Sequence, residues 1–566
     1  MAATTSARLT IVPAEAPVNA NTAPTTWDTR RARKRSRLQR VAKYANGRVF
    51  DTQRIVDVLH ALIEPGDRVC LEGNNQKQAD FLSRKLAEVD PARVHDIHLL
   101  LSVLGRPEHM DLFERGIAGR VDFSFSGPQS LRLAQMVEDR RVSIGAIHTY
   151  LELFARYFVD LTPDIALVAA DAADANGNLY TGANTEETPL IVEATAFRDG
   201  IVIAQVNRLS DTLPRVDIPS SWVDFVVVAD RPYAIEPLFT RDPALITDVQ
   251  ILMAMLAIRG VYEKHGVTRL NHGIGFDTAA IELLLPTYAE SLGLRGKICT
   301  HWALNPHPTL IPAIESGWIK SVHCFGGEVG MERYVAARPD VFFTGADGSL
   351  RSNRTYSQMA GLYATDLFIG STLQMDAQGN SSTATKGRIA GFGGAPNMGS
   401  DPHGRRHASG AWLQMRGEAG AHARGRKLVV QLVQSFRDGM QPTFVETLDA
   451  VEVGKSAGLP LPPVMIYGDD VTHVVTEEGI AYLYLARDAD ERRAALAAVA
   501  GVTPLGMESS QDKSTQLRKL GIVELPEDLG VRRVDARRSL LAAHNMREIV
   551  AWSGGLYEPP ARFRSW

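Results

Sequence analysis

The sequence has few cysteines and no long apolar run. Only three of its 566 residues are cysteine, Cys70, Cys299 and Cys324, and three widely spaced thiols do not build a disulfide framework. No stretch approaches the roughly 20 consecutive apolar residues that cross a bilayer. The first 27 residues also lack the apolar run of a secretory signal. We therefore expect a soluble protein of the reducing cytoplasm that does not associate with membranes.

A large excess of one charge is missing as well. The chain has 61 basic and 65 acidic residues, a net charge of −4, so as a whole it is not suited to binding polyanions. Apolar residues make up 45% and charged residues 22%, which is enough to bury a large interior. At roughly 100–200 residues per domain, the length predicts two to four domains.

The motifs of several enzyme classes are absent. Near His301, His307 and His323 there is no HExxH, CxxC or His-x-x-x-His spacing, so we predict no metal site. Such lone histidines are more often satisfied core or rim residues. The chain has no Gly-x-Ser-x-Gly elbow of a serine hydrolase. The glycine-rich segment at residues 387–399 matches neither the dinucleotide-binding fingerprint nor the P-loop.

A basic run is the first positive feature. Residues 30–43 carry eight basic side chains and no acid. Such a run is typical of a nucleic-acid patch or a localisation tag, or of a helix that docks on an acidic partner or on its own domain. The net acidic remainder of the chain favours docking. Residues 1–27 show no helical or strand period, and we treat residues 1–44 as a flexible basic N-terminal arm.

Strand-like runs alternate with amphipathic stretches from residue 45 to about residue 500. This alternation predicts α/β layers with largely parallel sheets. The strand candidates are VDFSF (121–125), DIALVAA (164–170), GIVIAQV (200–206) and DFVVVA (224–229), and the helix candidates are 77–88, 129–138, 248–259 and 427–438.

Two segments recur further along the chain. GDRVCLEG (66–73) and GVTRLNHG (266–273) share a glycine–six–glycine frame, at an offset of 200 residues. DIALVAADAADANGN (164–178) and DLFIGSTLQMDAQGN (366–380) share an aspartate–nine–aspartate frame, at an offset of 202 residues. Two matches at nearly one offset are hard to obtain by chance and indicate an internal duplication.

The duplication predicts two similar α/β domains, residues 45–240 and 245–500, with a cleft between them. Residues 501–566 then form a C-terminal extension. The D-A-x-G-N ends of the second pair are typical of tight turns, because glycine accepts positive φ and the acid satisfies nearby backbone groups. Such a turn says nothing about chemistry.

EGNNQKQ (72–78) follows a strand-like run, where an open α/β sheet places its ligands. Gly73 lets the backbone turn, and the helix that follows offers free N–H groups to an anion. Asn74, Asn75 and Lys77 add neutral donors and a positive charge, so the segment predicts an oxyanion or carboxylate site. A capped helix start with exposed amides explains the same residues equally well.

GRIAGFGGAPNMG (387–399) is a second candidate. Gly391, Gly393 and Gly394 remove side chains where a thioester or another backbone must approach closely. The DPHGRRH run that follows concentrates positive charge suited to phosphate or carboxylate, in His403, Arg405, Arg406 and His407. The alternative is a structural glycine loop beside a solvated surface run.

Glu328 is the candidate for covalent chemistry. It stands between Gly327 and Val329, where an exposed carboxylate could act as an acyl-transfer nucleophile. An acid that stabilises a helix start gives the same pattern.

Several segments resemble known families. ALVAADAADANGNLYTG (166–182), IAQVN (203–207), IPSSWVD (218–224) and VVTEEGIAYL (474–483) resemble the CoA-transferase superfamily. LEGNNQKQADFL (71–82), GIGFDTAAIELLLPTYAESLGLRG (273–296) and GRIAGFGGAPNMGSDPHGRRHASGAW (387–412) resemble the malonate decarboxylase alpha-subunit family, and this resemblance runs from about residue 27 to the C-terminus.

The resemblance implies two tandem CoA-transferase-like domains and a transferase reaction. Acetyl-S-carrier and malonate would give malonyl-S-carrier and acetate. The carrier would be an acyl carrier protein subunit with a phosphoribosyl-dephospho-CoA prosthetic group, and partner decarboxylase (beta and gamma) subunits would decarboxylate the malonyl thioester. No cofactor or metal bound by this chain is implied. A basic arm would guide the acidic carrier or another subunit.

The resemblance also bears on mechanism. Many CoA transferases carry a nucleophilic glutamate at the turn that opens the second half, and we place that turn near THW (300–302), which has no glutamate. We therefore expect direct exchange, with Glu328 as the covalent alternative. Gly73, Asn74 and Asn75 would stabilise the oxyanion, and Lys77 or Arg405 would hold the spare carboxylate. The other residues expected at the substrate or thioester are Asn207, Gly273, Gly275, His301, Gly391, Gly393, Gly394 and Asn397.

Four rival functions stay open. A citrate lyase-type carrier transferase is nearest, although the loop at 391–407 argues against it. A transferase or thioesterase acting on free CoA esters would turn over acetyl-CoA without any carrier. A non-catalytic scaffold subunit would exchange nothing. A nucleic-acid binder that uses residues 30–43 ranks last, and we expect no nucleic-acid partner.

Overall fold

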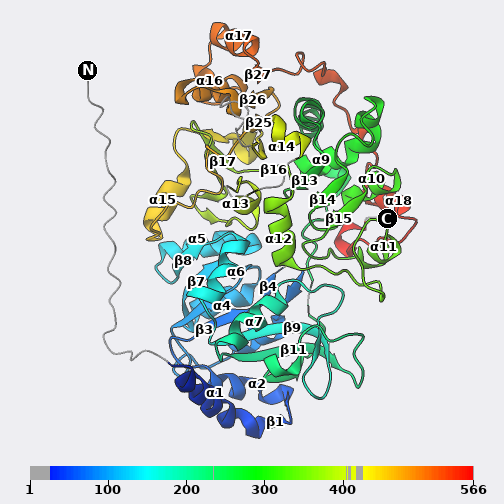
Figure 1. Ribbon diagram of the computed structural model, residues 1–566. Helices are drawn as coiled ribbons and strands as arrows, with labels where there is room; N and C mark the ends of the chain where they lie inside the picture. Colours follow the sequence, from blue (N-terminus) through cyan, green and yellow to red (C-terminus); the bar gives the residue numbers. More distant parts are fainter. Residues whose placement is uncertain are drawn as a thin grey trace.

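The computed structural model describes residues 26–74, 76–233, 235–402, 405, 409–415, 425–564 and 566. These residues form two α/β units, each built on a mostly parallel sheet. In Figure 1 the first unit, coloured blue to teal, lies below the second, coloured green to orange, and helix α12 (Arg354–Tyr363) lies between them. The predicted α/β class with parallel sheets is confirmed.

The first sheet has the order β1-β2-β12-β11-β9-β3-β6-β7-β8, with β10 paired to β9. Pairing is parallel from β2 to β8. The strands are β1 (Ala45–Asn46), β2 (Val49–Phe50), β3 (Arg68–Leu71), β6 (Ile97–Leu100), β7 (Ala118–Phe123), β8 (Ser143–Ile147), β9 (Ile165–Ala173), β10 (Leu179–Tyr180), β11 (Ile201–Leu209) and β12 (Phe225–Val228). The helices of this unit are α1 (Trp27–Val41), α2 (Ile55–Leu62), α3 (Asp80–Ala87), α4 (Pro107–Glu114), α5 (Ser130–Glu138), α6 (Tyr150–Val159) and α7 (Thr188–Phe197).

Both faces of this sheet are covered, and β9 shows how. Ile165 and Leu167 enter one apolar core, whereas Ala166 and Val168 enter another. Successive side chains of a strand point to opposite faces, so a strand covered on both sides reads as a continuous apolar run. For this reason DIALVAA was recognisable as a strand from the sequence.

The second sheet has the order β15-β14-β13-β16-β21-β25-β26-β27 and is parallel from β15 to β25. Its strands are β13 (Arg269–His272), β14 (His301–Ala303), β15 (Ser321–His323), β16 (Leu367–Ser371), β21 (Leu428–Leu432), β25 (His473–Val475), β26 (Ile480–Tyr482) and β27 (Val523–Glu524). The helices include α8 (Asp248–Ala257), α9 (Phe276–Leu284), α10 (Ile311–Glu315), α11 (Glu332–Ala337), α13 (Ala395–Met398), α15 (Asp449–Ser456), α16 (Ala489–Val499), α17 (Gln511–Lys519) and α18 (Met546–Trp552).

Two expectations for this unit were wrong. The predicted helix at 427–438 is strand β21, because the whole run LVVQL is buried in the centre of the sheet. The segment 501–566 is more than an extension: its strand β27 pairs with β26, and Ile549 of α18 enters the core of the second unit. The division of the chain at residue 500 therefore cuts through a sheet.

The structure repeats the turn that revealed the duplication. Asp174 Oδ1 accepts the backbone N–H of Asn178 at 2.9 Å, and Asp376 Oδ1 accepts that of Asn380 at 2.9 Å. Gly177 and Gly379 both have φ +87°. The two aspartates therefore close the same turn at the ends of equivalent strands in the two units.

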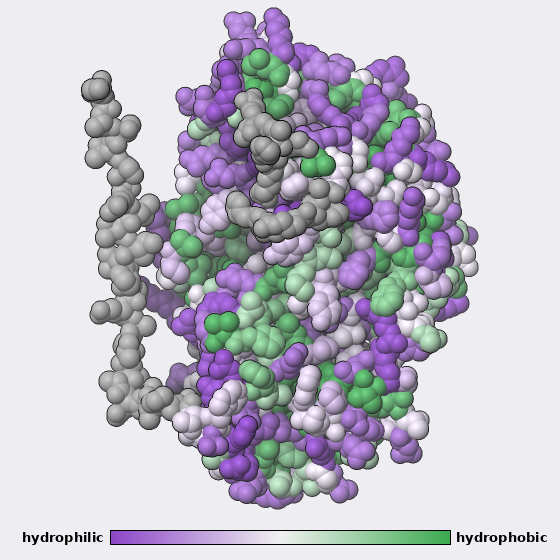
Figure 2. All heavy atoms as spheres, viewed as in Figure 1, coloured by the Kyte–Doolittle hydropathy of each residue, from purple (hydrophilic) through white to green (hydrophobic). Residues whose placement is uncertain are grey.

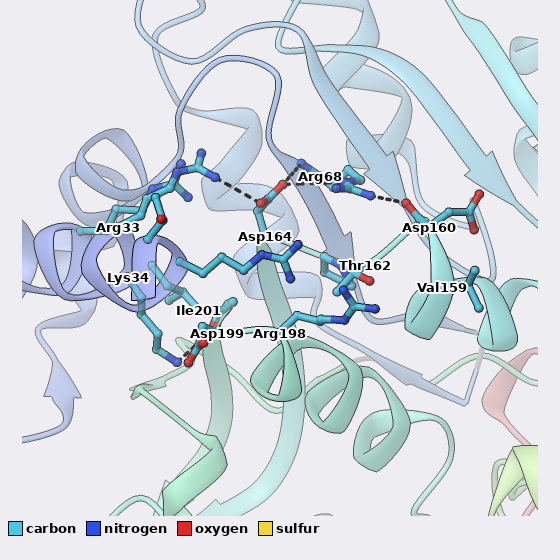
Figure 3. A pocket seen from close by; sticks show the side chains of 15 residues that line it. Arg33, Lys34, Arg68, Val159, Asp160, Thr162, Asp164, Arg198, Asp199 and Ile201 are labelled. Carbon is cyan, nitrogen blue, oxygen red and sulfur yellow. Dashed lines mark hydrogen bonds and ion pairs between the residues drawn. The ribbon is translucent and has the colours of Figure 1, made fainter. Parts of the chain in front are cut away.

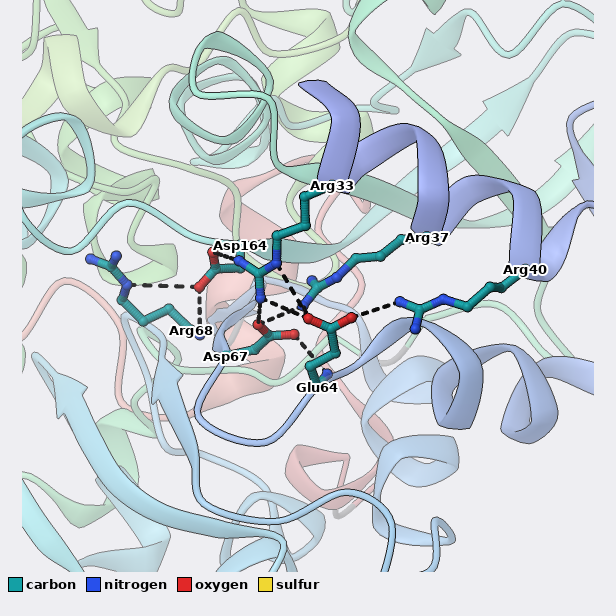
Figure 4. Close-up of polar contacts among 7 residues, drawn as sticks. All are labelled: Arg33, Arg37, Arg40, Glu64, Asp67, Arg68 and Asp164. Atoms are coloured by element: carbon teal, nitrogen blue, oxygen red, sulfur yellow. Dashed lines mark hydrogen bonds and ion pairs between the residues drawn. The ribbon is translucent and has the colours of Figure 1, made fainter. Parts of the chain in front are cut away.

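Helix α1 docks on the first unit through its arginines (Figure 4). Buried Arg37 donates to Asp67 at 2.9 Å and also to Glu64, and Arg33 donates to both acids at 2.9 Å. The hydrogen bond from Arg37 is the main reason why the pKa of Glu64 falls to about 2. Residues 27–41 thus form a helix held by the chain's own acids, as the docking interpretation predicts, and are not a flexible arm.

No helix in the described residues combines the length and apolar character needed to cross a membrane. The face shown in Figure 2 has polar residues interspersed with small apolar clusters.

A candidate active-site cavity between the two units

A cavity of about 210 Å³ lies between the two units. Phe125 and Tyr150 line it from the first unit, and Asn271, Asn305 and Ser371 line it from the second. The last three follow or end the parallel strands β13, β14 and β16 at their carboxyl ends. Ligands of open α/β sheets bind at that edge, and cavities between domains are common binding sites.

The glycine loop forms one wall of the cavity and also joins the units. Gly391, Gly393 and Gly394 line the cavity. Ser124 O accepts the N–H groups of Phe392 at 2.7 Å and Gly393 at 3.0 Å. A Cβ on Gly391, which has φ +76°, would lie 2.5 Å from Ser124 O. The close approach that requires Gly391 is therefore that of the first unit's own backbone.

Arg354 supplies a fixed positive charge at the cavity. Its guanidinium lies 4.9 Å from the centre of the Tyr150 ring and donates to Glu186 at 2.9 Å. Burial would lower the pKa of Arg354, but the surrounding acids and Tyr150 outweigh it and raise that pKa. The charge is thus matched by Glu186 inside the protein.

A buried carboxylate organises the histidines behind the opposite wall. Glu282 Oε1 lies 3.0 Å from His272 Nδ1 and 2.9 Å from His307 Nδ1, and Oε2 accepts the hydroxyl of Thr309. Burial would raise the pKa of Glu282, but the charge and hydrogen bonds of the two histidines outweigh it and lower the pKa to about 2. His272 and His307 both line the cavity.

The predicted oxyanion segment lies elsewhere. Asn74 Oδ1 accepts the backbone N–H groups of Gln76 at 2.7 Å and Lys77 at 3.0 Å, and buried Lys77 Nζ donates to Thr181 O at 3.0 Å. Gly73 packs against the carbonyl of Val103. None of these residues lines the cavity, and Asn75 lies outside the described residues. Local hydrogen bonds hold this hairpin closed.

Glu328 is buried rather than exposed. Its Oε1 accepts the N–H of Thr240 at 2.9 Å and its hydroxyl at 2.7 Å, and its Oε2 accepts Gln76 Nε2 at 3.2 Å. Burial raises the pKa of Glu328. Glu328 lines a separate cavity of about 40 Å³ with Gly327 and Pro306, so the expectation of an exposed carboxylate was wrong.

Other predicted residues are scattered. His301 begins β14, and Arg405 donates to Asp366 just before β16, so both lie at the amino ends of strands, away from the cavity. The amide of Asn397 donates to Gln358 and accepts from Thr149. Asn207 donates to Asp171. Gly273 lines the cavity, and Gly275 precedes α9. His403, Arg406 and His407 lie outside the described residues.

Sequence reasoning missed Asn271, Asn305 and Arg354, and it treated His307 only as a core or rim residue. Asn271 is the last residue but one of β13, and Asn305 and His307 follow shortly after the end of β14. Polar residues at the ends of parallel strands are the signal that could have found them. Arg354 begins a helix in a region without a recognised motif, and nothing in the sequence singles it out.

A second concavity, of about 290 Å³, lies on the far edge of the first sheet (Figure 3). It is formed by α1 and the amino ends of strands: Arg68 begins β3 and Asp164 precedes β9. Asp164 accepts the N–H of Arg68 at 3.0 Å and also Arg33 at 3.4 Å. The charges of this concavity are paired within the protein, and it lies at the amino ends of the strands, whereas ligands of open α/β sheets bind at the carboxyl ends. The cavity between the units is therefore the better candidate.

Two comparisons with known proteins show which family this chain resembles. The family model described as malonate decarboxylase, alpha subunit, transporter matches residues 26–566. The chain is 57% identical, over 530 residues, to the acetyl-S-ACP:malonate ACP transferase of Malonomonas rubra, covering 92% of this chain and 96% of that protein.

Solved structures give the same picture. A chain of a Pseudomonas malonate decarboxylase hetero-tetramer in complex with malonate has a TM-score of 0.94 and 66% identity, covering 96% of this chain and 100% of that one. An acyl-CoA transferase from Escherichia coli O157:H7 has a TM-score of 0.51 at 15% identity, covering 78% and 88%, and shares the fold. The predicted CoA-transferase-like fold is confirmed.

Proposed function

The chain belongs to the malonate decarboxylase alpha-subunit family, and from that premise we propose that it exchanges acetate for malonate on a carrier-bound thioester. Acetyl-S-carrier and malonate give malonyl-S-carrier and acetate. The observation that carries this proposal is the 57% identity to an acetyl-S-ACP:malonate ACP transferase across 92% of the chain. The cavity between the units is the site where the exchange would occur.

The partners follow from the same premise. The carrier is an acyl carrier protein subunit whose thiol ends a phosphoribosyl-dephospho-CoA arm, and the decarboxylase beta and gamma subunits consume the malonyl thioester in the cytoplasm. The hetero-tetramer of the Pseudomonas relative supports assembly with other subunits. In this proposal the chain itself binds no cofactor or metal and uses the carrier's prosthetic group as its substrate.

Direct exchange needs two balanced steps. A malonate carboxylate oxygen attacks the acetyl carbonyl carbon, a C–O bond forms, and the C–S bond breaks to release the carrier thiolate. The thiolate then attacks the malonyl carbonyl carbon of the mixed anhydride, and the C–O bond to acetate breaks. No proton has to be transferred, so the protein's task is to position the reactants and stabilise the oxyanions.

Two features of the structure support this route over a covalent one. Both oxygens of Glu328 already accept hydrogen bonds, from Thr240 and Gln76. Residues 300–302, where we place the turn that opens the second half, lead into strand β14 and contain no glutamate. Neither place offers a free glutamate to the cavity.

The proposal is tested by mixing the purified chain with acetyl-loaded carrier protein and isotopically labelled malonate. Mass spectrometry of the carrier should show malonyl-carrier with release of one acetate, and citrate should give no product. Turnover of acetyl-CoA without carrier would favour a free-CoA transferase. No transfer, even after the partner subunits are added, would contradict the proposal and favour a scaffold.

A further inference from the structure

Among the described residues, the buried Nε2 of His307, a residue that lines the cavity, has no hydrogen-bond partner. His307 is 5% exposed and lines the cavity, with its ring stacked on Phe239 at 5.1 Å between ring centres. Its Nδ1 is used by Glu282, but its buried Nε2 has no hydrogen-bond partner in the part of the chain that the structure describes. Buried polar atoms are nearly always hydrogen-bonded to protein or to ordered water, so an orphan beside a cavity marks a position that a polar ligand can take from water.

The surrounding network indicates which chemistry Nε2 presents. Glu282 is held as a carboxylate by its two histidines. His272 is saturated, because its Nδ1 faces Glu282 at 3.0 Å and its Nε2 lies 2.8 Å from the hydroxyl of Tyr262. Burial lowers the pKa of His272 and favours its neutral form. The doubly protonated form of His307 donates Nδ1–H to Glu282 and leaves Nε2–H for a ligand, which is the form that binds an anion.

The other polar groups of the cavity do not offer an unmatched charge. Arg354 is paired with Glu186 at 2.9 Å. Asn271 and Asn305, both neutral, donate to the carbonyls of Ala303 and Gly327. Lys77 and Arg405, which we first expected to hold a carboxylate, lie outside the cavity lining.

We infer that His307, oriented by Glu282, binds the carboxylate of malonate that does not react, and so selects a dicarboxylate over acetate. This inference rests on the proposed exchange reaction and names the residue that recognises its substrate. The carboxylate that attacks the thioester lies at the other end of the malonate molecule, so His307 contributes to malonate affinity and not to the exchange step itself. Two neighbouring carboxylates, of substrate and Glu282, would share one imidazolium, as a charge-assisted hydrogen-bond chain allows.

The test compares two exchanges with the same acetyl-loaded carrier, in the presence of the partner subunits. One uses labelled malonate, and the other uses labelled acetate, which can exchange with the acetyl group by the same two steps but has no second carboxylate. The variants are His307→Asn, which keeps a donor toward Glu282 and removes the one facing the cavity, and His307→Gln, which keeps an uncharged donor at the Nε2 position.

In His307→Asn we expect the KM for malonate to rise about 10- to 100-fold, while acetate exchange stays within about threefold of the parent. His307→Gln should lie between the two. Equal losses of malonate and acetate exchange would overturn the inference, since they indicate a structural or general role. An unchanged KM for malonate would overturn it as well. If the unaltered protein exchanges neither acid, the proposed function fails, and the inference falls with it.

Discussion

His307 Nδ1 lies 2.9 Å from Glu282 Oε1, and this contact joins two separate elements behind one wall of the cavity. Glu282 belongs to α9, which begins after the first strand of the second sheet, whereas His307 follows the second strand. The same carboxylate oxygen lies 3.0 Å from His272, at the end of β13. One buried acid thus fixes the side chains at the ends of two neighbouring strands.

The first prediction concerns Glu282→Gln. We expect a higher KM for malonate than in the parent, because without the carboxylate the His307 ring loses the charged partner that orients it. The variant should also be less stable at neutral pH. The pKa of Glu282 is lowered to about 2 in the folded chain, so its stabilisation, on the order of 3 kcal/mol, is present above the unfolded pKa of about 4.5 and lost as pH falls toward 2.

Thermal unfolding of parent and variant between pH 3 and pH 7 checks this. The difference between the two midpoints should be largest at neutral pH and shrink toward pH 3. A difference that does not change with pH would mean that Glu282 is not held as a carboxylate.

The fold was predictable wherever local chemistry repeats. Asn178 and Asn380 both accept a backbone N–H from a later segment, Ser220 and Gly468, each at 2.8 Å. The turn needs the same aspartate, glycine and asparagine in both units, so the sequence preserves it and exposes the duplication.

The glycine frame, which is the other repeat, predicts a register for β3 and β13 that differs by one residue from the register of the strands. Leu71 pairs with Leu167 and His272 pairs with Ile369, so equivalent residues of β3 and β13 differ by 201 positions, not by the 200 that the glycine frame indicated. Glycines at strand ends depend on close neighbours, and Gly273 approaches Gly370 in a way that Gly73 does not repeat. A shared glycine is thus a weaker marker of register than a shared turn.

The cavity was only partly predictable, for a physical reason. The glycine wall could be found because Gly391 needs its conformation locally. The significance of His307 depends on Glu282, which is 25 residues away in the chain, and on the ring of Phe239, which belongs to the segment between the units. Such a site is created by strand order, and a lone histidine in the sequence carries no sign of it.

The second prediction separates direct from covalent exchange. Glu328→Gln should keep malonate exchange within about tenfold of the parent, because the carboxylate only accepts hydrogen bonds from Thr240 and Gln76 and the amide oxygen can accept some of them. Glu328→Ala should lose more stability, since these buried donors are left unpaired. The measurements are the exchange rate, the unfolding midpoint and the carrier affinity. A Gln variant that binds carrier normally but has no turnover would establish the covalent route.

The third prediction tests the glycine wall. Gly391 and Gly387 both have positive φ, +76° and +71°, but only a Cβ at Gly391 collides, at 2.5 Å from Ser124 O. Gly387→Ala should cost about 1 kcal/mol of backbone strain. Gly391→Ala should cost clearly more and reduce both malonate and acetate exchange, because the loop must move away from the first unit. Equal unfolding midpoints for the two variants would show that the close approach of Gly391 to Ser124 O does not affect stability.

The last prediction concerns the docking of α1 through Arg37, which is 3% exposed. Burial raises the pKa of Asp67, and Arg37 donates to it at 2.9 Å. Arg37→Ala leaves this acid with exposed Arg33 as its remaining arginine partner, so we expect a loss of about 3 kcal/mol, the lower end for breaking a buried pair. Arg35→Ala is the matched control: Arg35 is exposed on the same helix, and its loss should change stability by less than about 0.5 kcal/mol.

The pH dependence gives this prediction its direction. The pKa of Glu64 is lowered to about 2, chiefly by its hydrogen bond with Arg37. The contribution of Glu64 to docking is therefore present above the unfolded pKa of about 4.5 and disappears as pH falls toward 2. Limited proteolysis within α1 at pH 7 should be faster in Arg37→Ala than in the parent and Arg35→Ala, and the difference between parent and Arg37→Ala should shrink as pH falls toward 2. Equal cleavage of all three at pH 7 would mean that hydrophobic contacts alone hold the helix, and that its arginines are free to serve a partner.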